Sequence, residues 1–282
     1  MASVIATNNA SVIAQGNLTG AQGAMAQSVQ RLSSGLRINS AKDDAAGLGI
    51  AQRLQAQITG GTVAARNASD AISMVQTAEG GMQEVSSMLQ RMRELATQGN
   101  NSSLNDTQRG YISTEVTALG AEIDKVSSRT TFNGMSLLNG SMSAGASFQV
   151  GVATTDTVDI GSLMQDVSTS SGLAALGTAI TTLAGSTSVS NMASLGTAVD
   201  TAIDTIAGYR SSLGAMNNRL DHNIANLQAQ TQALIASRSR ITDTDYAAET
   251  AQLSKNQVMS QAATAMLSQA NQMPNAVLSL LK

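Results

Sequence analysis

Residues Val199–Ile241 of the 282-residue chain read VDTAIDTIAGYRSSLGAMNNRLDHNIANLQAQTQALIASRSRI, and they contain its most regular apolar pattern. Apolar side chains recur in it at every seventh residue: Val199, Ile206, Leu213, Leu220, Leu227, Leu234 and Ile241. Such a repeat places one narrow apolar stripe along a helix, which is the contact line of a coiled coil. It predicts a long helix that packs lengthwise against another helix.

The N-terminal half carries a matching pattern between about Asp44 and Gln98. One apolar series comprises Ala68, Val75, Met82, Leu89 and Ala96, and the series three residues on comprises Ala71, Ala78, Val85 and Met92. The two series together occupy the a and d positions of a coiled coil. Gly99–Asn100–Asn101 are turn residues that end this helix. A second apolar helix pattern starts near Asn105, and the short connection predicts antiparallel packing of the two helices.

A third apolar series lies at the C-terminal end, where the steps alternate between four and three. It comprises Met259, Ala263, Met266, Ala270, Met273, Val277 and Leu280. No charged residue occurs in Asn256–Leu281 or in Met1–Gln30. Because a surface helix normally carries charge on its outer face, we expect these ends to pair with each other and with neighbouring subunits. The alternative is an amphipathic helix that merely has little charge.

The centre of the chain is polar and changes its period. Phe148–Val152 and Thr157–Ile160 alternate apolar and polar residues, which predicts a small β-hairpin. Residues 171–189 have no sustained periodicity, so we expect a short polar variable segment that faces solvent. The predicted fold class is mainly α: a long antiparallel coiled-coil helical bundle built from both chain ends, with a small central β-hairpin region.

Composition excludes several classes of function. The net charge is −3 without a basic tract, which argues against nucleic-acid binding. With no Cys and one His, no ordinary zinc site is expected. Asp43 and Asp44 are expected at a helix start, and Asp243 and Asp245 at a helix break, so we interpret them as capping residues. We therefore expect no catalytic site, no cofactor, no metal, no enzyme activity, no signal peptide and no insertion into a membrane.

Several runs of residues resemble the terminal signatures of the bacterial flagellins. They are Arg31–Gly47 (RLSSGLRINSAKDDAAG), Leu89–Ala96 (LQRMRELA), Thr131–Gly134 (TFNG), Ser239–Ile241, Asp245–Ala247, Gln269–Gln272 and Val277–Leu281. The runs are long and lie at both ends, and the resemblance covers roughly residues 1–160 and 190–282. Only the central part departs from large members of the family, because it is short.

The resemblance implies a division into layers. Residues 1–42 and 243–282 would form the innermost, channel-lining helical domain, which is disordered in the monomer. Residues 43–170 and 190–242 would form the surrounding coiled-coil core with the hairpin. The residues that we expect in the assembly seam are Val199, Ile206, Leu213, Leu220, Leu227, Leu234, Met266, Met273, Val277 and Leu280. The implied function is that of a subunit that polymerises into the flagellar filament for swimming.

The resemblance also implies partners and a location. The chain would be exported unfolded through the flagellar type III apparatus to the outside of the cell. Its partners would be further copies of itself, an export chaperone, cap and junction proteins, and the host Toll-like receptor for flagellin. Because Gln90–Gln98 resembles the flagellin segment that this receptor senses, Arg91, Leu95 and Glu115 are the implied receptor contacts. Arg91, Leu95 and Met88 share one flank of the helix, where we expect two apolar residues that the coiled-coil contact does not use. The alternative is that this flank packs against the antiparallel helix or a neighbouring subunit. Two alternatives stay open: a hook–filament junction protein and a plain coiled-coil binding protein.

Overall fold

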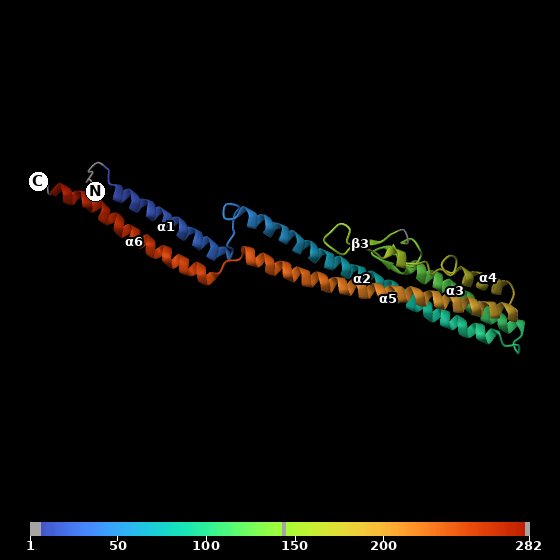
Figure 1. Cartoon of the computed structure of the whole chain (residues 1–282). Helices are drawn as coiled ribbons and strands as arrows, with labels where there is room; N and C mark the ends of the chain where they lie inside the picture. The colour runs from blue at the N-terminus through green and yellow to red at the C-terminus, as the bar shows by residue number, and fades with distance from the viewer. Residues whose placement is uncertain (1–6, 143–144, 280–282) are drawn as a thin grey trace. The chain divides into compact units, whose positions relative to one another are not determined.

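The computed structural model describes residues 7–142 and 145–279. Its helices are α1 (Asn9–Ser34), α2 (Ala45–Gly99), α3 (Asp106–Arg129), η1 (Gly161–Leu163), α4 (Ala174–Gly185), α5 (Val189–Thr242) and α6 (Tyr246–Ser279). Its strands are β1 (Thr131–Phe132), β2 (Met135–Ser136), β3 (Ser147–Gln149) and β4 (Thr157–Asp159). The predicted fold class is confirmed: the chain is mainly helical with small antiparallel hairpins in its middle (Figure 1).

The chain forms two compact units. Unit 1 comprises Met1–Ile58 and Gln232–Lys282, and unit 2 comprises Thr59–Thr231. The helices break between Ser34 and Ala45 and between Thr242 and Tyr246, near the expected domain limits at 42 and 243. The boundaries of the compact units lie elsewhere, at residues 58–59 within α2 and residues 231–232 within α5.

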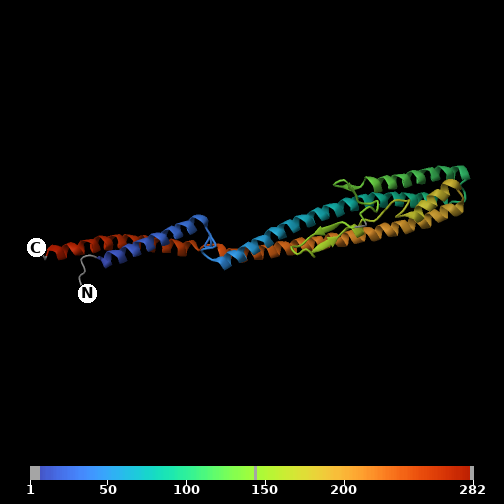
Figure 2. The same ribbon diagram turned by 90° about the horizontal axis from the view of Figure 1, so that it is seen from above.

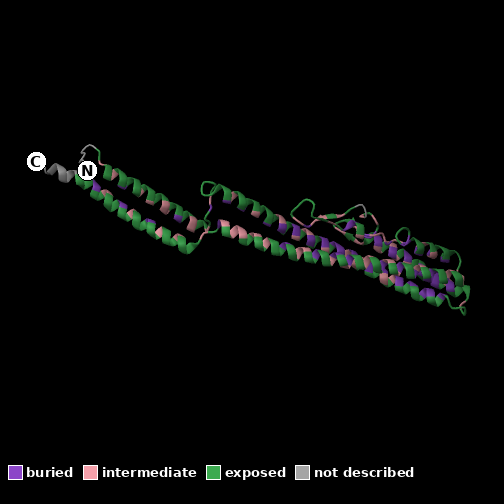
Figure 3. Ribbon diagram, in the orientation of Figure 1, coloured by how far each residue is buried: buried purple, intermediate pink, exposed green. Residues whose placement is uncertain are grey.

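Unit 2 is held together by the apolar stripes of α2 and α5, which run antiparallel. Arg93 pairs with Asp200 and Glu79 with Arg210, so residue numbers rise on one helix as they fall on the other. The predicted stripe residues of α5 in this unit are buried: Val199, Ile206, Leu213, Leu220 and Leu227. Figure 3 shows the buried residues concentrated on the facing sides of these helices. The seven-residue repeat is thus the internal core of the chain.

The end of α2 is fixed by a residue that the sequence pattern did not reveal. The helix ends at Gly99, as predicted. Arg109, which is only 6% exposed, donates from Nε to the Gly99 carbonyl and from Nη2 to the Asn101 carbonyl. Carbonyl groups at a helix C-terminus lack partners within the helix, and a guanidinium satisfies them well. The next helix, α3, begins at a capping box between Asn105 and Gln108.

Two hairpins follow α3. β1 and β2 are joined by Asn133 (φ 50°) and Gly134 (φ 79°), and two successive positive φ angles characterise the tight turn that suits a hairpin's twist. β3 and β4 pair antiparallel with Phe148 opposite Val158, which confirms the predicted central hairpin. Both side chains are half-buried against the core of unit 2.

The expectation that residues 171–189 are merely polar and face solvent is wrong. Residues Ala174–Gly185 form α4, which packs along α3. Its Leu176, Ile180 and Leu183 are buried, as is Leu173 just before it. The spacing of these four residues, three, four and three, forms one apolar face. The surrounding Ser, Thr and Gly conceal that face in the sequence.

Unit 1 contains the pair of α1 and α6, which lie side by side in both views (Figures 1 and 2). Asn8 Nδ2 donates to the Ala270 carbonyl at 2.7 Å, and Arg31 Nη1 lies 3.6 Å from Glu249 Oε2. Because the start of α1 meets the later part of α6 and its end meets the start of α6, the two helices are antiparallel. The residues that face the partner helix are mostly Ala, Ser and Leu. They are Ser11, Ala14, Leu18, Ala21, Met25, Ser28 and Leu32 of α1, and Leu253, Asn256, Ser260, Ala263, Leu267 and Ala270 of α6.

The expected C-terminal stripe is therefore half wrong within the chain. Ala263 and Ala270 face α1, but Met259, Met266 and Met273 are exposed. Each of the first two methionines stands one position before a residue of the α1 contact line, on its flank. Both series alternate by four and three, and on an uncharged helix nothing in the pattern distinguishes them. The remaining members, the side chain of Val277 and Leu280, lie outside the described residues.

Candidate functional site

The described residues offer no centre for metal chemistry. No group of three or more His, Asp or Glu side chains among them is arranged to hold a metal ion. None of the described helices combines the length and the apolar character that crossing a membrane requires. Three surfaces of the part of the chain that the structure describes are well defined.

The first surface surrounds Arg91 on α2. Its Nε donates to Glu115 Oε1 of α3 at 2.9 Å, and its Nη1 donates to Glu94 Oε2 at 2.9 Å. The hydrogen bond to Glu94 and then that to Glu115 raise the pKa of Arg91 above its ordinary value, so the guanidinium stays charged. The Arg91 and Glu115 side chains are about half exposed, at 51% and 45%. The structure thus brings together two of the three expected receptor contacts as an exposed ion pair.

The third expected contact lies elsewhere. Leu95 is only 2% exposed and belongs to the core of unit 2, and Met88 is half-buried against that core. Of the two expectations for this flank of α2, an exposed apolar patch is wrong and packing within the chain is correct. Leu95 stands four residues from Arg91, close enough to the same flank for the sequence to suggest exposure. α2 is covered on more than one side in unit 2, because α3 packs there as well as α5.

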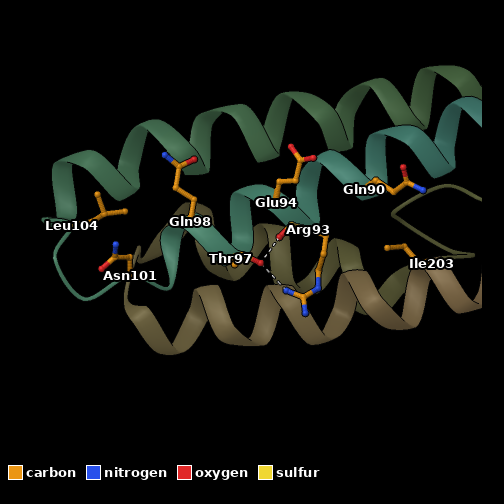
Figure 4. Close-up of a pocket in the computed structure, with 8 residues that line it drawn as sticks. All are labelled: Gln90, Arg93, Glu94, Thr97, Gln98, Asn101, Leu104 and Ile203. Carbon is orange, nitrogen blue, oxygen red and sulfur yellow. Dashed lines mark hydrogen bonds between the residues drawn. The ribbon is translucent and has the colours of Figure 1, made fainter.

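The second surface is a groove of about 690 Å³ near the C-terminal end of α2 (Figure 4). Gln90, Arg93, Glu94, Thr97, Gln98, Asn101, Leu104 and Ile203 line it. Arg93 Nη1 donates to Thr97 Oγ1 within the groove, and its Nε pairs with Asp200. The lining offers carboxamides and charged groups with apolar contact from Leu104 and Ile203, and sequence patterns did not indicate it because its residues come from three segments.

The third surface comprises the outer sides of α1 and α6. Large apolar side chains are exposed there although these helices carry almost no charge. They are Val12, Ile13 and Val29 of α1 and Val258, Met259, Met266 and Met273 of α6. Of the expected assembly residues whose side chains the structure describes, Met266 (64% exposed) and Met273 (58%) are the ones available to another copy. Leu234 is half-buried in unit 1, and the other members on α5 are buried inside the chain.

In unit 1, the segment that connects α1 to α2 is hydrogen-bonded to the segment that connects α5 to α6. Leu36 and Asp243 form an antiparallel bridge, in which the Arg37 N–H donates to the Thr242 carbonyl at 2.7 Å and the Thr244 N–H to the Gly35 carbonyl at 3.0 Å. Gly35 ends α1 with φ 71°, a conformation that glycine adopts readily. Asp44 Oδ1 accepts a hydrogen bond from the Gly47 N–H at the start of α2, so its expected capping role is correct. Asp43 instead accepts hydrogen bonds from the Asn39 and Ser40 N–H groups and holds the turn before the helix.

Comparison with known proteins identifies the family. The model of the bacterial flagellin N-terminal helical region matches residues 5–143, and that of the C-terminal helical region matches residues 197–281. The chain is 39% identical to flagellin of Bacillus subtilis over 91% of this chain and 92% of that protein. It is 40% identical to flagellin of Xenorhabdus nematophila, with both chains covered completely.

Solved structures agree with the fold. A putative flagellar hook-associated protein from Vibrio parahaemolyticus superposes with a TM-score of 0.59 over 71% of this chain and all of that chain. Its sequence is only 17% identical, so this likeness concerns the fold alone. The family of the sequence is shown by the two matched helical regions and by relatives that align with it over its full length. The terminal signatures agree with this assignment. The chain belongs to the bacterial flagellins, the structural subunits of the flagellar filament.

Proposed function

We propose that copies of the chain contact one another in the filament through the outer sides of α1 and α6, and that these helices form its innermost, channel-lining layer. The observation that carries this proposal is the exposure of large apolar side chains, such as Val258 and Met266, on helix segments that carry no charge. Exposed apolar surface of this kind is typical of contact between proteins. A contact repeated head to tail without closing produces an open helical polymer.

Residues 1–42 and 243–282 are ordered only on assembly in this proposal. The contact between α1 and α6 is made by Ala and Ser, which bury little apolar area, together with a few Leu and Met side chains that are only half-buried. Ordering a helix costs roughly 1–2 kcal/mol per residue in backbone entropy. The outer apolar side chains must therefore be covered by other copies before these segments fold. Residues 43–170 and 190–242 form the surrounding layer.

Truncation and substitution test this division. A chain that lacks residues 243–282 is expected to form no filaments in electron micrographs at high salt, while circular dichroism shows that the helices of unit 2 remain. Met266→Lys is expected to block polymerisation in the full chain, because it buries a charge between copies. Gln261→Lys on the same helix is the matched control, since Gln261 is exposed away from the methionines. Normal filaments from Met266→Lys would contradict the proposed contact.

Export is the second part of the proposal. We infer that the chain leaves the cell unfolded through the flagellar type III apparatus, escorted by an export chaperone, and meets junction and cap proteins at the growing filament. Membership of the flagellin family and the weak independent packing of unit 1 support this route. Expression in a motile strain with and without a functional export gate tests it. Chain in the medium of the gate-deficient strain would contradict it.

Recognition by the host Toll-like receptor for flagellin is the third part. We propose that Arg91 and Glu115 contact the receptor directly, because they form an exposed pair that spans α2 and α3. Leu95 contributes to recognition indirectly, because its packing in the core of unit 2 holds the part of α2 that carries Arg91. A charged pair at the edge of an interface chiefly gives specificity and steers association. The variants that test this part are argued in the Discussion.

A further inference from the structure

Three methionines of α6 occupy one flank of the helix at intervals of seven residues. Met259, Met266 and Met273 are 53%, 64% and 58% exposed. Since seven residues make almost two helical turns, their thioether groups share one side of α6. Among the described side chains of α6, Val258 and Tyr246 are also large, apolar and exposed.

The other methionines of the chain have different surroundings. Those of unit 2 are mostly buried: Met74, Met82, Met92, Met164, Met192 and Met216. Met135 is 42% exposed, but it lies in the short hairpin of β1 and β2, away from the terminal helices in the sequence. Met25 is half-buried where α1 faces α6. An oxidant in solution therefore reaches the three methionines of α6 more readily than the methionines of the core.

We propose that Met259, Met266 and Met273 form an oxidation-sensitive site, at which conversion to methionine sulfoxide prevents the chain from joining a polymer of its copies. The oxidant is a peroxide. Its distal oxygen adds to the thioether sulfur as the O–O bond breaks, the sulfur loses two electrons, and hydrogen peroxide leaves as water. A dithiol with a methionine sulfoxide reductase reverses the step, since the dithiol becomes a disulfide and the oxygen leaves as water.

The effect of oxidation follows from the construction of the α1–α6 pair. A sulfoxide is polar and accepts hydrogen bonds, so burying it without a donor costs free energy. The charged residues nearest to the three methionines in the sequence are Lys255 and Lys282, which lie outside the uncharged stretch Asn256–Leu281. The residues directly beside the methionines are uncharged: Val258, Ser260, Ala265, Leu267, Gln272 and Pro274. About half of the residues on the contact line with α1 are Ala and Ser, so the α1–α6 pair buries little apolar area that could offset the lost contact.

Assembly also determines when the site reacts. The inference rests on the proposed contact between copies, in which the methionine flank is covered in the filament. Free chain then presents the three thioethers to peroxide, while polymerised chain protects them. A peroxide is thus expected to stop growth without dissolving filaments that already exist.

The experiment compares free and polymerised full chain after treatment with dilute hydrogen peroxide. Mass spectrometry of peptides is expected to find sulfoxide at Met259, Met266 and Met273 in free chain and much less in filaments. The critical concentration for polymerisation of the oxidised chain, measured by light scattering and electron microscopy, is expected to rise about tenfold or more. Treatment with the reductase and a dithiol is expected to restore it.

Substitutions isolate the site. The triple variant M259L/M266L/M273L keeps apolar side chains of similar volume and is expected to polymerise equally well before and after peroxide. It retains Met25, so its resistance assigns the effect to α6. Met135→Leu is the matched control and is expected to stay sensitive. The triple variant M259Q/M266Q/M273Q is expected to imitate the oxidised chain.

Two results overturn the inference. One is normal polymerisation of wild-type chain in which all three residues are sulfoxides. The other is a leucine variant that peroxide inhibits as strongly as wild type. These differ from failure of the proposed contact, which would show as filaments from untreated chain carrying Met266→Lys. In that case the methionine flank is not covered and both proposals are lost.

Discussion

Single polar side chains fix the points where the helices of this flagellin end. Arg109 satisfies carbonyl groups at the end of α2, Asn105 caps α3, and Asp43 holds the turn that precedes α2. The roles of Asn105 and Asp43 are local, so sequence spacing can indicate them. Arg109 acts across a loop on groups ten residues away, and no local pattern carries that information. Leu95 shows the same limit, because its burial depends on how α3 lies against α2.

Asp43 gives unit 1 a dependence on pH. The hydrogen bond from the Asn39 N–H, followed by that from the Ser40 N–H, lowers the pKa of Asp43 below the ordinary 3.8. Because the folded state has the lower pKa, the stabilisation is present above the unfolded value and is lost as pH falls through the folded value. We expect an NMR titration of the Asp43 carboxyl to give a midpoint below 3.8.

At the scale of elements, regular apolar repeats could be predicted and mixed ones could not. The stripe of α5 contains large aliphatic residues between polar ones, so only one packing direction buries them. In α6 both candidate faces are uncharged, and small residues such as Ala263 pack as closely as the methionines would. The choice between faces depends on where α1 lies. α4 was missed although Leu173, Leu176, Ile180 and Leu183 follow helical spacing, because the helix is short and surrounded by Gly, Ser and Thr.

α4 is expected to stabilise unit 2. Leu176→Ala and Leu183→Ala each remove a fully buried side chain and should each lower the free energy of unfolding by about 2–4 kcal/mol. Urea denaturation followed by circular dichroism measures the loss. The exposed residues Thr178 and Thr181 of the same helix serve as controls, and their replacement by Ala should change stability by less than about 0.5 kcal/mol. Equal effects at both kinds of position would mean that α4 does not pack on α3 in solution.

At the scale of the whole molecule, the two units differ in how much they bury. The core of unit 2 includes large side chains from α2, α3, α4 and α5, such as Met82, Ile123 and Leu176. In unit 1 the described buried residues of α1 and α6 are Ala14, Ser28, Asn256, Ala263 and Ala270. Apolar burial is the main source of stability, so unit 2 should be stable in the monomer and the α1–α6 pair should not.

Limited proteolysis of the monomer tests this difference. A protease is expected to remove both ends rapidly and to leave a fragment close to Thr59–Thr231. The same protease should leave the ends intact in filaments, if copies cover α1 and α6 there. Mass spectrometry of the fragments at successive times locates the cuts. Slow cleavage before Arg31 and after Lys255 in the monomer would show that the α1–α6 pair is stable without other copies.

The Arg91–Glu115 pair allows recognition by the receptor to be separated from folding and from assembly. Reversal in Arg91→Glu places three carboxylates together and should abolish signalling in receptor-reporter cells. The exchanged pair R91E/E115R restores an ion pair within the chain, which maintains stability, but it presents the opposite charges to the receptor. If Arg91 and Glu115 contact the receptor, the exchanged pair therefore stays inactive although its thermal unfolding matches that of wild type. Recovery of signalling by the exchanged pair would mean that the pair only holds α2 and α3 together.

The motility of the same variants shows whether filament contacts share this surface. A non-motile exchanged pair indicates that polymerisation and the receptor compete for the surface, so that only shed monomer signals. A motile one would assign the surface to recognition alone.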